Sequence, residues 1–131
     1  MIQSKRGVVL NWTFEGGIPI WWQICEKLRR SIILGEYQPY DRIPGVRELA
    51  AEAQVNPNTM QRALAKLEDE GLIVTRATNG RFVSADTEMI RLARKAMVSE
   101  AASNYLNKCA EIGISREEAI SILQEEGDNI G

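Results

Sequence analysis

The side chains best suited to specific chemistry in this 131-residue sequence lie together between residues 56 and 62. The amides of Asn58 and Gln61 can each form two hydrogen bonds to an adenine edge. Arg62 can bind a phosphate or a guanine, and the hydroxyl of Thr59 can bind a phosphate. Helical spacing places Asn58, Gln61 and Arg62 on one face. This pattern predicts a helix that contacts bases and phosphates of duplex DNA; the alternative is a solvated helix surface.

A helix that carries this face has clear start and stop signals. Asn56 is a good N-cap and Pro57 a good first helical residue, while Gly71 is suited to end the helix. The opposite face is apolar at the helical period, which predicts that four side chains are buried. These are Met60, Ala63, Leu64 and Leu67.

Two earlier helices are predicted to support this one. Pro19 opens a segment that ends at Gly35 and has isoleucine or leucine at positions 20, 24, 28 and 32, the period of one buried helix face. After a turn-rich stretch over 36–45, a short helix over 46–52 is followed by the turn at residues 54–57. We expect Val55 of this turn to fill the core, which makes the second and third helices a helix-turn-helix.

A β-hairpin is predicted after the third helix. Runs of β-type residues at 72–76 and 81–84 flank Ala77-Thr78-Asn79-Gly80, and Asn-Gly between two such runs is a strong hairpin signal. In a winged helix-turn-helix, the third helix enters the major groove, about 12 Å wide, and the hairpin reaches the adjacent minor groove. The predicted fold class is therefore mostly α (α+β), a winged helix-turn-helix followed by a C-terminal helical hairpin.

The remaining residues predict two helices. A helical pattern runs from Asp86 to about Ile112, Gly113 breaks it, and Ser115-Arg116-Glu117-Glu118 is a capping box for a second helix. A helical pair of this size is too small to enclose a pocket of about 300 Å³, and the sequence identifies no small-molecule effector.

We divide the chain into an N-terminal arm (1–18), a winged helix-turn-helix (19–85) and a helical dimerisation region (86–131). Two-fold symmetric proteins bind palindromic half-sites, so a homodimer would recognise operator DNA better than one small module. Packing of the helical region within one chain is the alternative. The apolar residues expected at the dimer interface are Met89, Leu92, Ala93, Ala96, Met97, Tyr105 and Leu106.

The composition argues against an enzyme and against a metal site. The chain has no histidine, which excludes Ser-His-Asp and Cys-His catalysis and removes the commonest zinc ligand. Cys25 and Cys109 lie far apart in apolar helical patterns, so we expect reduced core thiols, with a redox switch as the alternative. The acidic pairs Glu117-Glu118 and Glu125-Glu126 have the pattern of solvated helix faces. We expect no catalytic residue, no metal and no cofactor.

Hydropathy and charge favour a cytoplasmic protein with no membrane partner. No apolar run approaches the roughly 18 residues of a membrane span, and the first residues lack the apolar core of a signal peptide. The net charge is −2, with 11 basic and 9 acidic side chains in residues 1–85 against 5 and 9 in residues 86–131. Because residues 1–85 are only weakly basic, a module that binds other proteins remains the alternative function.

Five motifs follow one another at fixed spacings over about residues 19–84. They are Pro19-Ile20-Trp21-Trp22-Gln23-Ile24, Ile43-Pro44-Gly45-Val46-Arg47-Glu48-Leu49-Ala50, Val55-Asn56-Pro57-Asn58-Thr59-Met60-Gln61-Arg62-Ala63, Leu67-Glu68-Asp69-Glu70-Gly71-Leu72-Ile73 and Gly80-Arg81-Phe82-Val83. Taken together, these motifs resemble the GntR family of transcriptional regulators, and the Asn-Pro-Asn-Thr turn is similar to its YtrA-like subfamily. The resemblance implies a homodimer that binds double-stranded, palindromic operator DNA as a repressor, although nothing in these residues distinguishes a repressor from an activator.

The resemblance also implies roles for single residues. An arginine at the head of the second helix, a group around the start of the third helix, and the wing tip contact DNA in the family. The full set expected here is Arg47, Asn56, Asn58, Thr59, Gln61, Arg62, Asn79, Gly80 and Arg81. The sequence departs from the family pattern at Tyr40, Gly45, Thr78 and Arg81, where glycine, serine, glycine and threonine are common. We expect Thr78 and Arg81 to alter the shape of the wing and its preference among minor-groove sequences.

Overall fold

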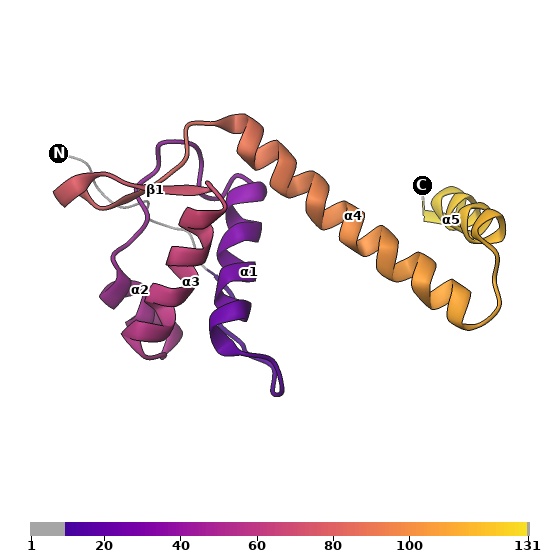
Figure 1. The fold of residues 1–131 in the computed structure, drawn as a ribbon, viewed down its shortest axis with the longest axis horizontal. Coiled ribbons are helices and arrows are strands. Elements are labelled where there is room, and N and C mark those ends of the chain that lie inside the picture. The colour runs from indigo at the N-terminus through magenta and orange to yellow at the C-terminus, as the bar shows by residue number, and fades with distance from the viewer. Residues whose placement is uncertain (1–9, 131) are drawn as a thin grey trace. The chain divides into compact units, whose positions relative to one another are not determined.

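The computed structural model describes residues 10–130, so the first nine residues of the predicted arm and residue 131 lie outside the described part. The chain forms two compact units whose boundary falls between Ala93 and Arg94. The elements in order (Figure 1) are α1 (Ile20–Ile33), α2 (Val46–Ala53), α3 (Pro57–Asp69), β1 (Ile73–Thr75), the 3-10 turn η1 (Ala77–Asn79), β2 (Arg81–Val83), α4 (Thr87–Glu111) and α5 (Arg116–Ile130). This order confirms the predicted fold class.

The core of the first unit forms where α3 packs on both α1 and α2. The apolar side of α3 is buried as predicted: Met60, Ala63, Leu64 and Leu67 have no exposed surface. On α1, the residues at positions 24, 28 and 32 are buried, whereas Ile20 is 43% exposed. The buried face of α1 therefore begins one turn later than its spacing predicts. On α3, the side opposite the buried residues is not covered by the core.

The turn between α2 and α3 sets where the third helix begins. Gln54 ends α2 in the left-handed conformation, with φ 57°, and Val55 packs against the core as expected. The side-chain oxygen of Asn56 accepts a 2.7 Å hydrogen bond from the backbone N–H of Asn58. Pro57 follows as the first helical residue. The N-cap and the proline together start α3 immediately after a three-residue connection.

The predicted hairpin is present, with shorter strands than the sequence indicates. β1 and β2 pair antiparallel, with Ile73 opposite Val83 and Thr75 opposite Arg81. Residues 76–80 connect them through η1, and Gly80 has φ +102°, a conformation that residues with side chains rarely adopt. The hairpin is also tied to the segment before α2, because Arg42 forms an isolated β-bridge with Phe82.

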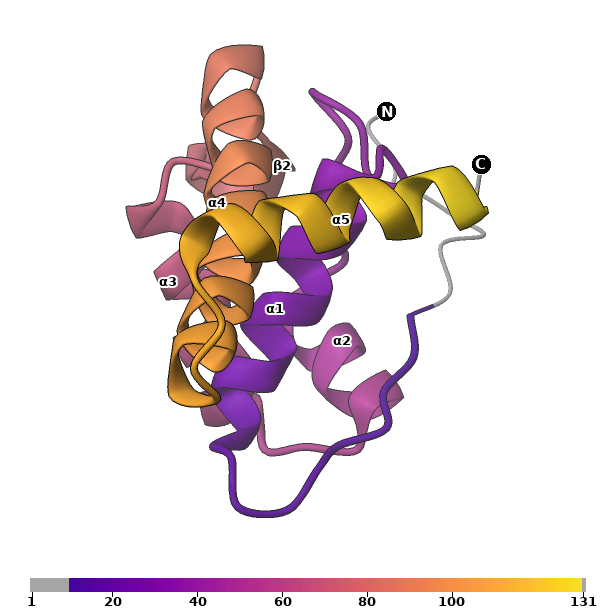
Figure 2. The same cartoon turned by 90° about the vertical axis from the view of Figure 1, so that its right-hand side faces the viewer.

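α4 begins in the first unit and continues into the second, where a tight turn leads to α5. Gly113 in this turn has φ +81°, and the hydroxyl of Ser115 accepts a 3.1 Å hydrogen bond from the N–H of Glu118, half of the predicted capping box. The Tyr105 hydroxyl donates a 2.6 Å hydrogen bond to the carbonyl of Ala119, which is fully buried. Figure 2 shows that α5 runs across the direction of α4. Within residues 10–130, no helix combines the length and the apolar character of a membrane span.

Candidate nucleic-acid interface

The uncovered face of α3 carries the polar side chains that the sequence singles out. Asn58, Gln61 and Arg62 are exposed, in contrast to the buried apolar side of the same helix, which confirms the predicted orientation of α3. Thr59 is half-buried. Asn56 is exposed, but its side-chain oxygen already serves as the N-cap, so only its NH2 group is left for a ligand. This face offers amide and guanidinium groups side by side.

Arg62 has an aromatic neighbour that the sequence analysis did not include. The Arg62 guanidinium carbon lies 4.2 Å from the centre of the Trp21 ring, a cation–π contact between α3 and α1. Trp21 is half-buried. The contact uses the face of the guanidinium group, so its N–H groups can still reach a phosphate or a base. The only sequence signal for it is a tryptophan next to the buried face of α1.

Arg47 lies at the head of α2, as the second residue of the helix, and its side chain is exposed. The N-cap before it is Gly45, which provides no side-chain hydrogen bond to the helix. Because α2 packs directly on α3, Arg47 belongs to the same compact unit as the polar face of α3. A second positively charged group is therefore presented by the helix-turn-helix.

The wing tip is braced by Arg42, a residue that the sequence analysis also missed. Its Nε donates a 3.0 Å hydrogen bond to the carbonyl of Asn79, and its guanidinium group covers Gly80. A Cβ atom at Gly80 would lie 3.2 Å from the Arg42 nitrogens, so both the φ and the close contact favour glycine there. Asn79 is exposed at the tip. A basic residue in the turn-rich segment 36–45 is the only hint of this brace in the sequence.

Arg81 does not extend freely from the wing. Its Nε lies 2.5 Å from a carboxylate oxygen of Glu68, and its Nη2 donates a 3.1 Å hydrogen bond to the side-chain oxygen of Gln61. The Thr75 hydroxyl donates to the same Glu68 oxygen at 2.7 Å. Burial alone would raise the pKa of Glu68, but the hydrogen bonds from Thr75 and Arg81 outweigh it and hold this pKa below its ordinary value. The wing and α3 are therefore joined by an ionised network.

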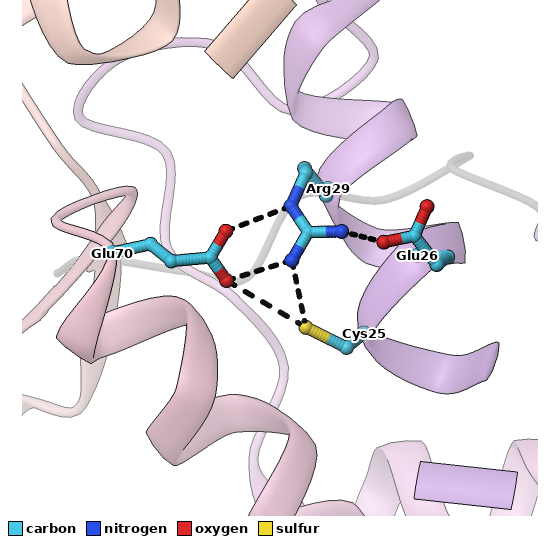
Figure 3. A network of polar contacts seen from close by, with 4 residues as sticks. All are labelled: Cys25, Glu26, Arg29 and Glu70. Carbon is cyan, nitrogen blue, oxygen red and sulfur yellow. Dashed lines mark hydrogen bonds and ion pairs between the residues drawn. The ribbon is translucent and has the colours of Figure 1, made fainter. Parts of the chain in front are cut away.

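A second network fastens the C-terminal end of α3 to α1 (Figure 3). Glu70, the C-cap of α3, accepts hydrogen bonds from Arg29 at 2.9 and 2.7 Å, and Glu26 accepts another from the same guanidinium group. Arg29 also donates to the sulfur of Cys25 at 3.3 Å. Burial raises the pKa of Cys25 to about 11, so its thiol stays protonated at neutral pH. Both Cys25 and Cys109 are buried, without a disulfide.

The residues expected at a dimer interface differ in how far they are exposed. The side chain of Met89 lies against Gly71, and Ala93 packs on the core of the first unit, so both already have neighbours within the chain. Leu92 and Ala96 are exposed, whereas Met97, Tyr105 and Leu106 are half-buried. Within the described part of the chain, no cluster of three or more cysteine, histidine or acidic residues is arranged to hold a metal ion.

Sequence comparison relates this chain to bacterial regulatory proteins. Residues 22–83 match the family described as "Bacterial regulatory proteins, gntR family". The chain is 30% identical to the uncharacterized HTH-type transcriptional regulator YhcF of Bacillus subtilis, over 82% of this chain and 88% of the relative. It is also 30% identical to the HTH-type transcriptional repressor YtrA of the same organism, over 82% of this chain and 83% of the relative.

Solved structures agree with the sequence relatives. A GntR family transcriptional regulator from Listeria monocytogenes is similar with a TM-score of 0.79 and 30% identity, over 86% of this chain and 98% of that one. The DNA-binding domain of AraR, solved in complex with operator ORX1, is similar with a TM-score of 0.52 and 27% identity, over 55% of this chain and 93% of that one. The AraR structure is thus a similar DNA-binding domain bound to an operator.

Proposed function

This chain is a DNA-binding transcriptional regulator that belongs to the GntR family, and we propose that it represses transcription as a homodimer bound to a palindromic operator. The observation that carries the proposal is the exposed polar face of α3, backed by a fully buried apolar face. This arrangement allows the helix to enter a major groove without loss of the core. Because bacterial operators lie in the cytoplasm, the proposal places the protein there.

We assign base and phosphate contacts to the predicted set on α2, α3 and the wing. Gln61 and Asn58 offer amides to base edges, and Arg62, stacked on Trp21, offers a guanidinium group to a phosphate or a guanine. Arg47 adds a positive charge at the head of α2. The braced wing tip at Asn79 and Gly80 is suited to approach a minor groove, since glycine leaves little bulk there.

The homodimer is supported by apolar side chains that remain exposed on α4 and α5. Leu92, Val98, Ile120 and Leu123 have 46%, 66%, 45% and 52% of their surface exposed, which is unfavourable in water unless another surface covers them. A second copy of the chain would cover them symmetrically. Two recognition helices related by a two-fold axis would then contact half-sites about 34 Å apart, which gives the operator its palindromic form.

Repression is the form of regulation that the relatives favour. The relative YtrA is named a repressor, and it covers most of this chain. Beyond the first unit, the described residues form the rest of α4 and then α5. We assign these two helices to assembly of the dimer, with occupation of the operator as the step that blocks transcription.

Selection of binding sites from a randomised duplex library tests this function. The full-length protein should enrich an inverted repeat, and sedimentation should give two chains per duplex. Binding measured over a range of salt should weaken steeply, with a slope of about −0.9 for each phosphate neutralised. Arg47→Ala should reduce binding, whereas Arg116→Ala on α5, an equal loss of charge in the other unit, should not. Enrichment of no sequence would instead support a module that binds other proteins.

A further inference from the structure

We propose that Arg81 determines the base preference of this protein by orienting the side-chain amide of Gln61, so that Gln61 favours guanine over adenine. The inference rests on the proposed function, since it concerns the helix assigned to operator DNA. Arg81 is in this view a positioning residue, which acts through Gln61, and its own contact with DNA is secondary.

The orientation of the Gln61 amide follows from the chemistry of its neighbour. Nη2 of Arg81 lies 3.1 Å from Oε1 of Gln61. A guanidinium group carries only N–H donors, so the amide atom that faces it must be the oxygen. The NH2 group of Gln61 consequently points to the other side of the amide. A charged donor at the oxygen also polarises the amide, which makes this NH2 group a stronger donor.

Arg81, on β2, is held in position by Thr75 of β1 and Glu68 of α3. Its Nε bonds Glu68 at 2.5 Å, and Thr75, its partner across the hairpin, bonds the same oxygen at 2.7 Å. Glu68 and Gln61 are seven residues apart on α3, which places them on one side of the helix two turns apart. The side chains of Arg81 and Glu68 are 20% and 31% exposed, so water screens this ion pair less than one at an open surface.

A fixed donor group distinguishes the two purines. In the major groove, guanine presents two adjacent acceptors, N7 and O6, whereas adenine presents the N7 acceptor beside the N6 amino donor. A free glutamine amide favours adenine, because its oxygen accepts from N6 and its nitrogen donates to N7. Because the Gln61 oxygen is bound to Arg81, the group left for the base is its NH2 donor. This donor matches the guanine acceptors but faces a second donor at the adenine amino group. One net hydrogen bond corresponds to about a 2- to 12-fold preference for guanine.

A direct phosphate contact by Arg81 would have different consequences. Loss of such a contact would weaken binding equally for all sequences and would reduce the salt slope by about one. It would leave the preferred bases unchanged. The order of bases at one operator position, and not the affinity alone, therefore separates a positioning role from a phosphate contact.

The experiment is selection from a randomised duplex library with the full-length protein and three variants. Wild-type half-sites should contain a position where guanine exceeds adenine, and Gln61→Ala should remove that preference, which assigns the position to Gln61. Arg81→Thr should raise adenine to at least the level of guanine at the same position. Arg76→Thr, the loss of another wing arginine, which lies over the Phe82 ring, should leave the base preference there unchanged.

Arg81→Met is a second release variant beside Arg81→Thr, because it keeps a long side chain but has no N–H donor for the Gln61 oxygen. It carries the test if Arg81→Thr fails to fold, as judged by circular dichroism and thermal unfolding. Three outcomes would overturn the inference and leave the proposed function standing: adenine preferred at the Gln61 position by the wild type, no position that depends on Gln61, or an unchanged preference in a folded release variant. A wild-type protein that enriches no sequence would overturn both.

Discussion

Replacement of Leu64 by alanine should destabilise the first unit by about 3–4 kcal/mol. Leu64 is fully buried on α3, the helix that contacts both α1 and α2. The change removes about three methylene equivalents, each worth about 0.8 kcal/mol when buried. The cavity left behind adds about 1 kcal/mol or more, which agrees with the range of about 2–5 kcal/mol for buried leucines replaced by alanine.

Thermal and urea unfolding followed by tryptophan fluorescence measure this loss in the relevant unit. All three tryptophans, Trp12, Trp21 and Trp22, lie in the first unit, so their signal reports its unfolding. The melting temperature should fall by roughly 12–30 °C, because 1 kcal/mol shifts it by about 4–8 °C in a domain of this size. A scan of the wild type at matched concentration supplies the reference.

Lys66→Ala is the matched control, since Lys66 is exposed on the same helix. A surface substitution of this kind should change the stability by less than about 0.5 kcal/mol. A loss below about 1 kcal/mol for Leu64→Ala would mean that α3 is rotated about its axis. In that case the assignment of Asn58 and Gln61 to the DNA-facing side would fail with it.

Three further predictions follow from the interface, the unit boundary and a buried phenol. Arg47→Ala should weaken operator binding by about 5- to 150-fold and Gln61→Ala by about 2- to 12-fold, with little change in melting temperature, measured by fluorescence anisotropy; unchanged affinity in both would refute the assignment. A chain that ends at Ala93 should fold, because Ile90 stays in the core, but should sediment as a monomer while the full-length protein dimerises. Burial, with nearby acidic residues, raises the pKa of Tyr37 from its ordinary value of 10.0 to about 12. The stability contributed by its neutral phenol should therefore be fully present below pH 10 and decline as the pH rises toward 12. Unfolding experiments across this range should show a weaker decline in Tyr37→Phe.

The sequence alone determined the features that depend on local physics. Asn56 and Pro57 mark the start of α3, because capping and the fixed φ of proline act within a few residues. The buried and exposed sides of α3 follow from the 3.6-residue period, so Leu64 and Gln61 could be assigned before any tertiary contact was known. The wing likewise follows from Asn79-Gly80 between two β-type runs.

The partners of the charged side chains could be identified only from the folded chain. Arg42 and Asn79 are 37 residues apart in the chain, and Arg29 and Glu70 are 41 apart, so no helical or strand period relates them. Arg81 was expected to extend to DNA, and its link to Gln61 became visible only once β2 was packed beside α3. Such pairs depend on how elements far apart in the sequence are oriented. That orientation is set by the shared core, whereas the identity of each side chain shows only what it is able to bind.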